Sequence, residues 1–172
     1  MKKIGQILVL SLFLFTGIVT AQTKGSTAPS QKEGLSLVMS VEREATIKKD
    51  GKTQIKLEPV KKTSKGDILV YTLKYKNEDK EKLTSASFVT PIPEGTSYQD
   101  KSAVGKGTDI LFSIDKGVVY RKPPIKYSAK TSDGKTEEKV ATPDMYTHIR
   151  WVLMKDLQPG DTGSVTFKTK VR

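Results

Sequence analysis

The sequence predicts an all-β protein, a sandwich of about seven to nine short antiparallel strands stacked in two sheets. Two observations lead to this fold class. Along most of the chain apolar residues alternate with polar ones, as they do on a strand with one buried and one solvated face. Turn signals rich in Gly, Pro, Asp and Asn separate these stretches, and long helical periodicity is missing.

The C-terminal stretch carries the clearest alternation. We expect strands over residues 147–153 and 164–171, joined by a short Pro-Gly turn at 158–161 and adjacent in one sheet. In each of these strands the apolar residues occupy every second position, which we call the apolar parity. Trp151, the single tryptophan of the chain, lies mid-strand on this parity and is predicted to be the centre of the core. The other residues on this parity are Ile149, Leu153, Val165, Phe167 and Val171.

The rest of the chain predicts further strands in a regular succession. The segments that show this alternation cover residues 35–41, 45–47, 55–57, 68–76, 86–90, 110–114, 118–120, 125–129 and 135–140. Asp50-Gly51 is expected to form a two-residue hairpin turn, because glycine accepts a positive φ without strain. Pro91-Ile92-Pro93 ends the strand before it, since proline cannot donate to a sheet ladder. The 125–129 and 135–140 segments are expected to pair as a hairpin inserted before the Trp151 strand.

The N-terminus is typical of an exported protein. A basic start, Met1-Lys2-Lys3, precedes an uncharged run that ends at Val19-Thr20-Ala21, so residues 1–21 are predicted to be a cleaved secretory signal peptide. The alternative is a retained membrane anchor, because a run of about 18 apolar residues is near the lower limit for a span. Residues 22–34 are predicted to be a flexible polar leader, and residues 35–172 a single domain with no membrane span.

Composition restricts the partners and the chemistry. The chain has no cysteine, which excludes thiolate metal sites, redox chemistry and disulfides. The whole chain has 30 Lys+Arg and 19 Asp+Glu, and removal of Lys2 and Lys3 would leave a mature net charge of about +9. Such a charge favours acidic partners. For an exported chain these are an envelope protein or an acidic surface polymer, such as lipopolysaccharide or surface polysaccharide, and not nucleic acid.

Five ordered stretches resemble a known bacterial family. They are 66–73 with Asn77, 91–98, 112–117, 146–151 and 157–161. In this order they resemble the bacterial surface-repeat family known as domain of unknown function eleven. The resemblance implies an immunoglobulin-like β-sandwich in an exported protein, and it brings no agreed reaction. Thr90 departs from the pattern, since many members have an acidic residue before the Pro-x-Pro turn, so a shared cation-binding role of that turn is in doubt.

Candidate catalytic and metal-binding residues are few. His148 is the only histidine, and nothing in the sequence places a nucleophile and an acid beside it. With no cysteine, one histidine excludes most transition-metal sites, and no cofactor is expected. Calcium could use turn aspartates, but these are explained by turn formation: Asp109, Asp115, Asp144 and Asp161. A glycoside hydrolase needs two carboxylates that project into a cleft. The candidates, Glu94 and Glu137-Glu138, lie in a predicted turn and a hairpin arm, which seldom form a cleft unaided.

The basic residues near the C-terminus suggest a docking face. His148 and Arg150 have the polar parity of one strand, and Lys168, Lys170 and Arg172 have that of its presumed neighbour. The five are expected on one sheet face that could dock a polyanion, with Lys74 and Lys76 on the other sheet. The alternative is that lysines solvate exposed strands and protect sheet edges.

The sequence therefore predicts a non-enzymatic, exported module of the cell envelope that acts by surface contact, either in the periplasm or at the cell surface. The first alternative is a polyanion-binding protein that uses the basic face. The second is a hydrolase with a site built from loop acids. The sequence assigns neither the partner nor the oligomeric state.

Overall fold

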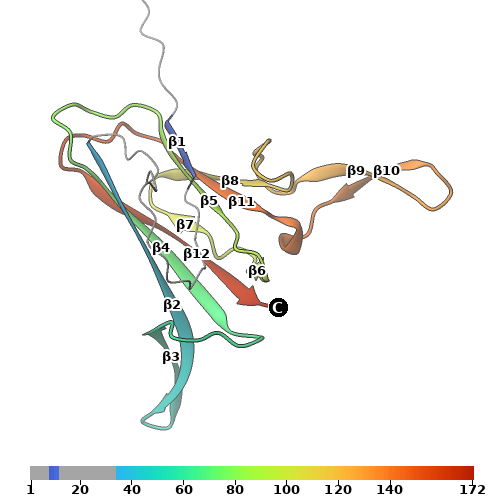
Figure 1. The fold of residues 1–172 in the computed structure, drawn as a ribbon, viewed down its shortest axis with the longest axis horizontal. Helices are drawn as coiled ribbons and strands as arrows, with labels where there is room; N and C mark the ends of the chain where they lie inside the picture. The colour runs from blue at the N-terminus through green and yellow to red at the C-terminus, as the bar shows by residue number, and fades with distance from the viewer. Residues whose placement is uncertain (1–7, 12–33) are drawn as a thin grey trace, which may run out of the picture.

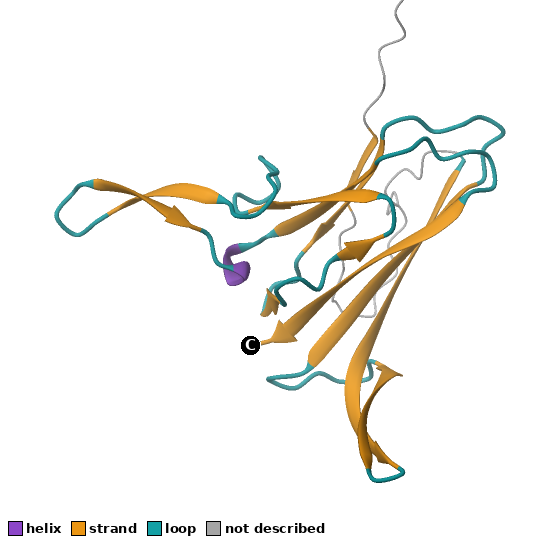
Figure 2. Ribbon diagram, turned by 180° about the vertical axis from the view of Figure 1, so that it is seen from behind, coloured by secondary structure: helices purple, strands orange, loops and turns teal. Residues whose placement is uncertain are grey.

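The computed structural model describes residues 8–11 and 34–172, and the predicted all-β class is confirmed for them. The strands are β1 (Leu8–Ser11), β2 (Leu35–Lys49), β3 (Lys52–Pro59), β4 (Ile68–Asn77), β5 (Ala86–Pro91), β6 (Thr96–Tyr98), β7 (Val104–Gly105), β8 (Thr108–Ser113), β9 (Lys126–Lys130), β10 (Thr136–Val140), β11 (His148–Leu153) and β12 (Thr162–Val171). The prediction of seven to nine strands was too low, partly because short strands such as β6 and β7 carry too little alternation to detect. The one helical element described is the 3₁₀ turn η1 (Pro143–Met145), drawn in purple in Figure 2.

The strands form two larger sheets and one separate hairpin (Figure 1). The six-stranded sheet has the order β3-β2-β4-β12-β6, with β7 also paired to β12. The four-stranded sheet has the order β1-β5-β11-β8. Pairing is antiparallel throughout except between β1 and β5. The β9–β10 hairpin and the distal part of β2–β3 both extend away from the body (Figure 1).

The N-terminal expectations are only partly covered by the described residues. Residues 8–11, from the stretch expected as a signal peptide, form β1 on the edge of β5. The rest of that stretch and the leader up to residue 33 lie outside the described residues, so the signal peptide and the domain boundaries stay predictions. Within residues 8–11 and 34–172 no helix is long and apolar enough to span a membrane.

The core lies between the two larger sheets, with Trp151 at its centre as predicted. Trp151 on β11 is 0% exposed, and its ring centroid lies 5.9 Å from that of Phe167 on β12. Tyr75 on β4 stacks on Phe88 on β5 at 4.6 Å. Both contacts join opposite sheets, so the sheets pack face to face. Other buried residues of this core are Leu69, Tyr71, Leu73, Phe112, Ile149 and Val165, the last two of which were predicted to be there.

The prediction that the last two strands are neighbours in one sheet is wrong. β11 pairs with β5 and β8, whereas β12 pairs with β4, β6 and β7. Residues 154–161 cross from one sheet to the other. Leu157 in this segment exchanges both backbone hydrogen bonds with Leu83, each 2.9 Å long. The alternating pattern of β11 and β12 is the same in either topology, because each strand buries one face against the same core.

Both predicted hairpins are confirmed. Asp50 and Gly51 connect β2 to β3 with φ angles of 51° and 71°. Positive φ at both central residues is the conformation of a type I′ turn, which matches the twist of paired strands. β9 and β10 pair antiparallel as the hairpin inserted before β11.

Candidate functional site on the outer face of the six-stranded sheet

The face of the six-stranded sheet that points away from the core is open and carries two shallow grooves. Even-numbered residues of β2, β4 and β12 make this outer face, because their odd-numbered neighbours are in the core. Most are small hydroxyl residues or charged residues. The hydroxyl residues are Ser36, Ser40, Thr72, Thr162, Ser164 and Thr166. Side chains this small leave room above the sheet.

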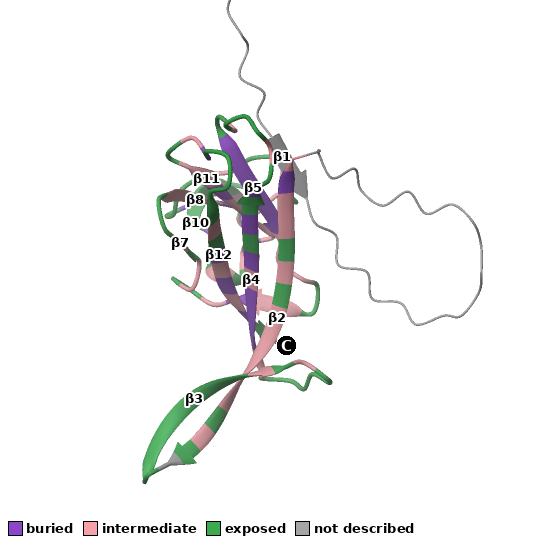
Figure 3. Ribbon diagram, turned by 90° about the vertical axis from the view of Figure 1, so that its left-hand side faces the viewer, coloured by how far each residue is buried: buried purple, intermediate pink, exposed green. Residues whose placement is uncertain are grey.

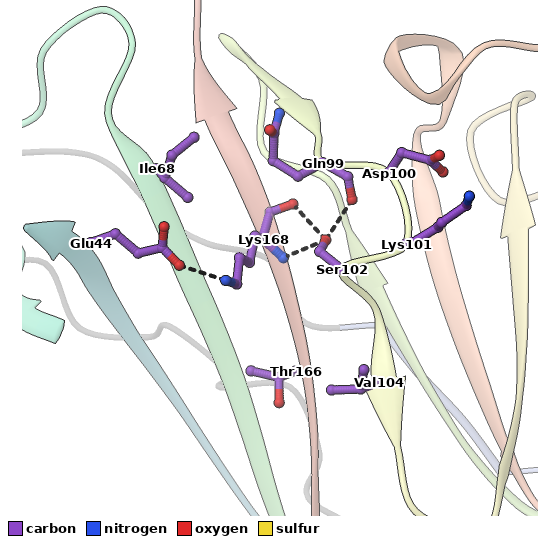
Figure 4. Close-up of a pocket in the computed structure, with 9 residues that line it drawn as sticks. All are labelled: Glu44, Ile68, Gln99, Asp100, Lys101, Ser102, Val104, Thr166 and Lys168. Carbon is purple, nitrogen blue, oxygen red and sulfur yellow. Dashed lines mark hydrogen bonds and ion pairs between the residues drawn. The ribbon is translucent and has the colours of Figure 1, made fainter. Parts of the chain in front are cut away.

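The larger groove has a volume of about 620 Å³ and lies over β12, between the Ile68 end of β4 and the segment 99–104 (Figure 4). Ile68 and Thr166 lie on its floor, and Val104 stands at one side with 55% of its surface exposed. The 99–102 loop continues the wall on the side of Val104, with Asp100 and Lys101, and Glu44 lies at the opposite side. The groove therefore combines an apolar base with charged sides.

An ion pair spans the groove across β4. Lys168 Nζ on β12 lies 2.5 Å from Glu44 Oε1 on β2, and the two strands flank β4. The Glu44 side chain is only 16% exposed, whereas that of Lys168 is 42% exposed. Val70 of β4 pairs with Lys168 and is buried although it points to the outer face. The ion pair thus covers part of the sheet and neutralises one of the predicted docking lysines.

The 99–102 loop is fixed to β12 by hydrogen bonds. Ser102 Oγ donates to the Gln99 carbonyl at 2.6 Å and accepts from the Lys168 backbone N–H at 3.0 Å. The Gln99 backbone N–H also donates to the Lys168 carbonyl at 2.9 Å. These bonds, drawn in part in Figure 4, hold the wall of the groove in place.

The second groove, of about 410 Å³, lies on the same face toward the other end of β4. Val38 lines it and is 58% exposed. Lys74 and Lys76 project from β4 on the same side, and Lys76 Nζ lies 3.4 Å from Glu78 Oε1. The two grooves make one continuous candidate surface along the sheet.

The prediction that five basic residues share one sheet face is wrong. Lys168 and Lys170 do lie on the outer face of the six-stranded sheet. His148 and Arg150 are on β11 of the other sheet, so they face the opposite side of the molecule. Arg172 follows the end of β12, and its guanidinium donates to the Asp144 carbonyl of η1 at 3.2 Å.

The assignment of Lys74 and Lys76 to the other sheet is also wrong. β4 pairs directly with β12, with Lys74 opposite Ser164 and Lys76 opposite Thr162. The basic residues of the outer face are therefore Lys74, Lys76, Lys168 and Lys170. Sequence parity had placed each on a polar face but could not decide which strands were adjacent.

His148 and Arg150 interact with the loop that follows β8. The Arg150 guanidinium lies 4.0 Å from the centre of the Tyr120 ring, a cation–π contact. His148 Nδ1 is 3.2 Å from Thr147 Oγ1. Burial lowers the pKa of His148, and the nearby Asp115 carboxylate partly opposes this. These contacts hold the loop on the outside of the four-stranded sheet.

The candidate acidic residues are dispersed. Glu137 and Glu138 lie on β10 and form ion pairs with Lys139 and Lys126, and neither they nor Glu94 line either groove. The candidate calcium aspartates serve separate turns or ion pairs, such as Asp109 with Lys122 at 2.8 Å. No group of three or more His, Cys, Asp or Glu residues suited to a metal ion occurs in the described part of the chain.

Comparisons with known proteins gave no match: no family model matches the chain, and no curated protein or solved structure matches it significantly. The resemblance to domain of unknown function eleven therefore rests on the sequence motifs alone.

Proposed function

We propose that this protein is an exported, non-enzymatic module of the cell envelope that acts by surface contact, through the outer face of the six-stranded sheet. The observation that carries the proposal is that both grooves open on this one face. A rigid, two-layered β body with two grooves on one face presents a fixed surface to a partner. Residues from four strands and one fixed loop contribute to that surface.

The groove chemistry favours a protein partner. Ile68, Thr166 and Val104 offer apolar and hydroxyl contacts, while Lys168 is already paired with Glu44. Apolar contact area ringed by charges is the usual composition of a protein interface. A partner segment that lies along the groove would contact the apolar base and exchange hydrogen bonds with its charged sides.

We also propose that the two-layered β fold is an immunoglobulin-like sandwich. It is supported by two mainly antiparallel sheets packed face to face around a central tryptophan, which is the arrangement expected of such domains. The membership in domain of unknown function eleven, the signal peptide and a periplasmic or cell-surface location are proposed with it.

A pair of double variants tests the contact surface. Lys101→Asp with Val104→Asp alters the large groove. Lys116→Asp with Val118→Asp makes the same changes in the loop outside the other sheet, where Val118 is 78% exposed. Lys101 and Lys116 share a positive φ, 58° and 60°, which aspartate tolerates. The pairs are therefore matched in residue type and charge change, and the two lysines are also matched in backbone φ.

Capture of envelope proteins by the immobilised chain, quantified by mass spectrometry, is the measurement. We expect the wild type and the Lys116/Val118 variant to capture the same partner, and the Lys101/Val104 variant to capture less than about a tenth as much, because two new carboxylates in an interface cost several kcal/mol. Equal capture by both variants, or no specific capture by the wild type, would refute the proposal.

Polyanion binding is the second candidate, favoured by the four lysines of the outer face. Lys74 and Lys170 carry no ion pair among the described residues, whereas Lys76 and Lys168 each have one. Docking would require salt-sensitive retention on heparin or lipopolysaccharide. Retention that is unchanged after Lys168→Glu with Lys170→Glu would exclude this function.

A further inference from the structure

Within residues 8–11 and 34–172, no strand covers the β3 edge of the six-stranded sheet. β3 ends this sheet, and every residue of β3 except Glu58 is exposed. Figure 3 shows the β2–β3 hairpin continuing beyond the body as a two-stranded ribbon. Ile55 and Leu57 on this ribbon are 66% and 42% exposed. An isolated two-stranded ribbon is marginally stable in water, and further strands stabilise it.

The backbone of β3 is free to pair on its outer side. Lys49 and Lys52 flank the two-residue turn and face each other. Residues in this position bond to each other, and the direction of the backbone groups then alternates along the strand. The odd-numbered residues from Thr53 to Leu57 therefore direct their N–H and C=O groups away from β2. These groups are ready to accept another strand.

We propose that two copies of the chain pair through β3, antiparallel, about a two-fold axis at Ile55. In this register Ile55 faces its own copy, and Thr53 faces Leu57 of the second copy. Lys52 faces Glu58 of the second copy, twice by symmetry. The exposed apolar side chains then meet across the junction, and opposite charges lie directly opposite each other, both of which stabilise a strand pair.

The charges of β3 select this register over its neighbours. An axis at Gln54 would place Lys52 opposite Lys56 of the second copy, and an axis at Lys56 would place Lys56 opposite itself. Like charges directly opposite each other are destabilising. An axis at Leu57 would bring Pro59, which has no N–H to donate, into the ladder. The register centred on Ile55 avoids both penalties.

The pairing would place the two proposed contact surfaces on one side of the dimer. The two-fold axis of an antiparallel strand pair is perpendicular to the sheet, so the outer faces of both copies point the same way. The two six-stranded sheets become one continuous sheet that presents its grooves twice. The pairing depends on neither export nor the identity of the partner, so the failure of one proposal leaves the other standing.

Disulfide trapping tests the register, because the natural chain has no cysteine. Ile55→Cys introduces a single thiol at the axis. Facing Cα atoms in an antiparallel pair are about 4.5–5.5 Å apart, within the range of a disulfide. We expect mild oxidation to give a covalent dimer with Ile55→Cys and little with Val38→Cys, a control of similar exposure on the body. Equally fast cross-linking of both variants would overturn the proposal.

Charge reversal provides a second test that needs no cross-link. Sedimentation equilibrium of the full chain should show a concentration-dependent dimer. Lys52→Glu should weaken dimerisation by roughly tenfold, because two like-charge pairs replace two opposite-charge pairs. Lys52→Glu combined with Glu58→Lys should restore it. A wild type that stays monomeric at high concentration, or a double variant that is no better than Lys52→Glu, would contradict the pairing.

Discussion

One buried amide fixes the end of β4. Asn77 is 0% exposed, and its Nδ2 donates to the carbonyls of Glu81 and Leu157, both at 2.9 Å. Its Oδ1 accepts from the Asp79 backbone N–H at 3.0 Å. Asn77 therefore links β4 of one sheet to the segment that crosses to it from the other. The predicted strand ended one residue earlier, at residue 76, and nothing in the sequence indicated that Asn77 is buried, because a buried asparagine and a turn asparagine look alike in sequence.

Replacement of Asn77 by alanine should destabilise the fold. Asn77→Ala removes three hydrogen bonds made by a buried side chain, at a cost of about 2–3 kcal/mol in the free energy of unfolding. The Leu157 carbonyl and the Asp79 N–H keep their bonds to Leu83 and Gly34. Urea denaturation measures the loss, and Lys80→Ala at an exposed position of the same turn is the control. A change below about 0.5 kcal/mol would mean that water replaces the amide without penalty.

A second polar residue, Asp115, organises the loop after β8. The Ser113 hydroxyl donates to its carboxylate at 2.6 Å, and the Val119 and Val118 backbone N–H groups donate at 2.9 and 3.1 Å. These bonds, that of Ser113 first, hold the pKa of Asp115 below its ordinary value. The bonds stabilise the ionised form, so the loop depends on pH.

The sign of this dependence follows from the direction of the shift. A carboxylate whose folded pKa is lowered stabilises the fold above its ordinary range, and the contribution is lost as the pH falls through the folded pKa. Asp115→Ala should therefore be less stable than the wild type at neutral pH, with a difference that shrinks on acidification. Denaturation curves at a series of pH values test this, and a difference that is independent of pH would contradict it.

At the scale of elements, alternation predicted which faces are buried but not which strands are adjacent. The apolar faces of β11 and β12 were predicted correctly. The placement of β11 and β12 in one sheet was not, because residues 154–161 can close a hairpin or cross between sheets with the same pattern on either side. The β2–β3 hairpin was predictable, because Asp50-Gly51 strongly favours a two-residue turn between paired strands.

The pairing of β12 with β4 depends on a glycine. Gly163 faces Tyr75, and a Cβ at Gly163 would lie 2.2 Å from the Tyr75 Oη. The Tyr75 ring is buried and stacked on Phe88, so it cannot move freely. Gly163→Ala should cost about 1–3 kcal/mol in unfolding free energy, the usual cost of overpacking. Ser164→Ala, one residue away on the exposed side, is the control.

A change of the facing residue, Tyr75, tests whether a clash with its ring causes the loss of stability in Gly163→Ala. If the clash with the ring is responsible, Tyr75→Leu combined with Gly163→Ala should cost less than the sum of the two single changes. Strictly additive costs would show that Gly163 matters for another reason.

For the whole molecule, the sequence predicted the layered β architecture and the polar faces but not the candidate site. The Lys168–Glu44 pair joins residues 124 positions apart, and no local pattern signals it. Sequence parity placed Lys168 and Lys170 on a polar face correctly. It grouped them with His148 and Arg150 only because β11 and β12 were taken as neighbours. The grooves depend on strand order, which alternation does not encode.

Because the two sheets pack on each other around Trp151, the outer face of the six-stranded sheet points toward solvent. The free energy of unfolding of the Trp151→Ala variant tests this packing most directly. The indole is 0% exposed and lies against Phe167 of the opposite sheet, so its removal should cost about 3–5 kcal/mol in chemical denaturation. Val118→Ala, at a position 78% exposed, should change little. A loss below about 1 kcal/mol for Trp151→Ala would contradict this arrangement of the sheets.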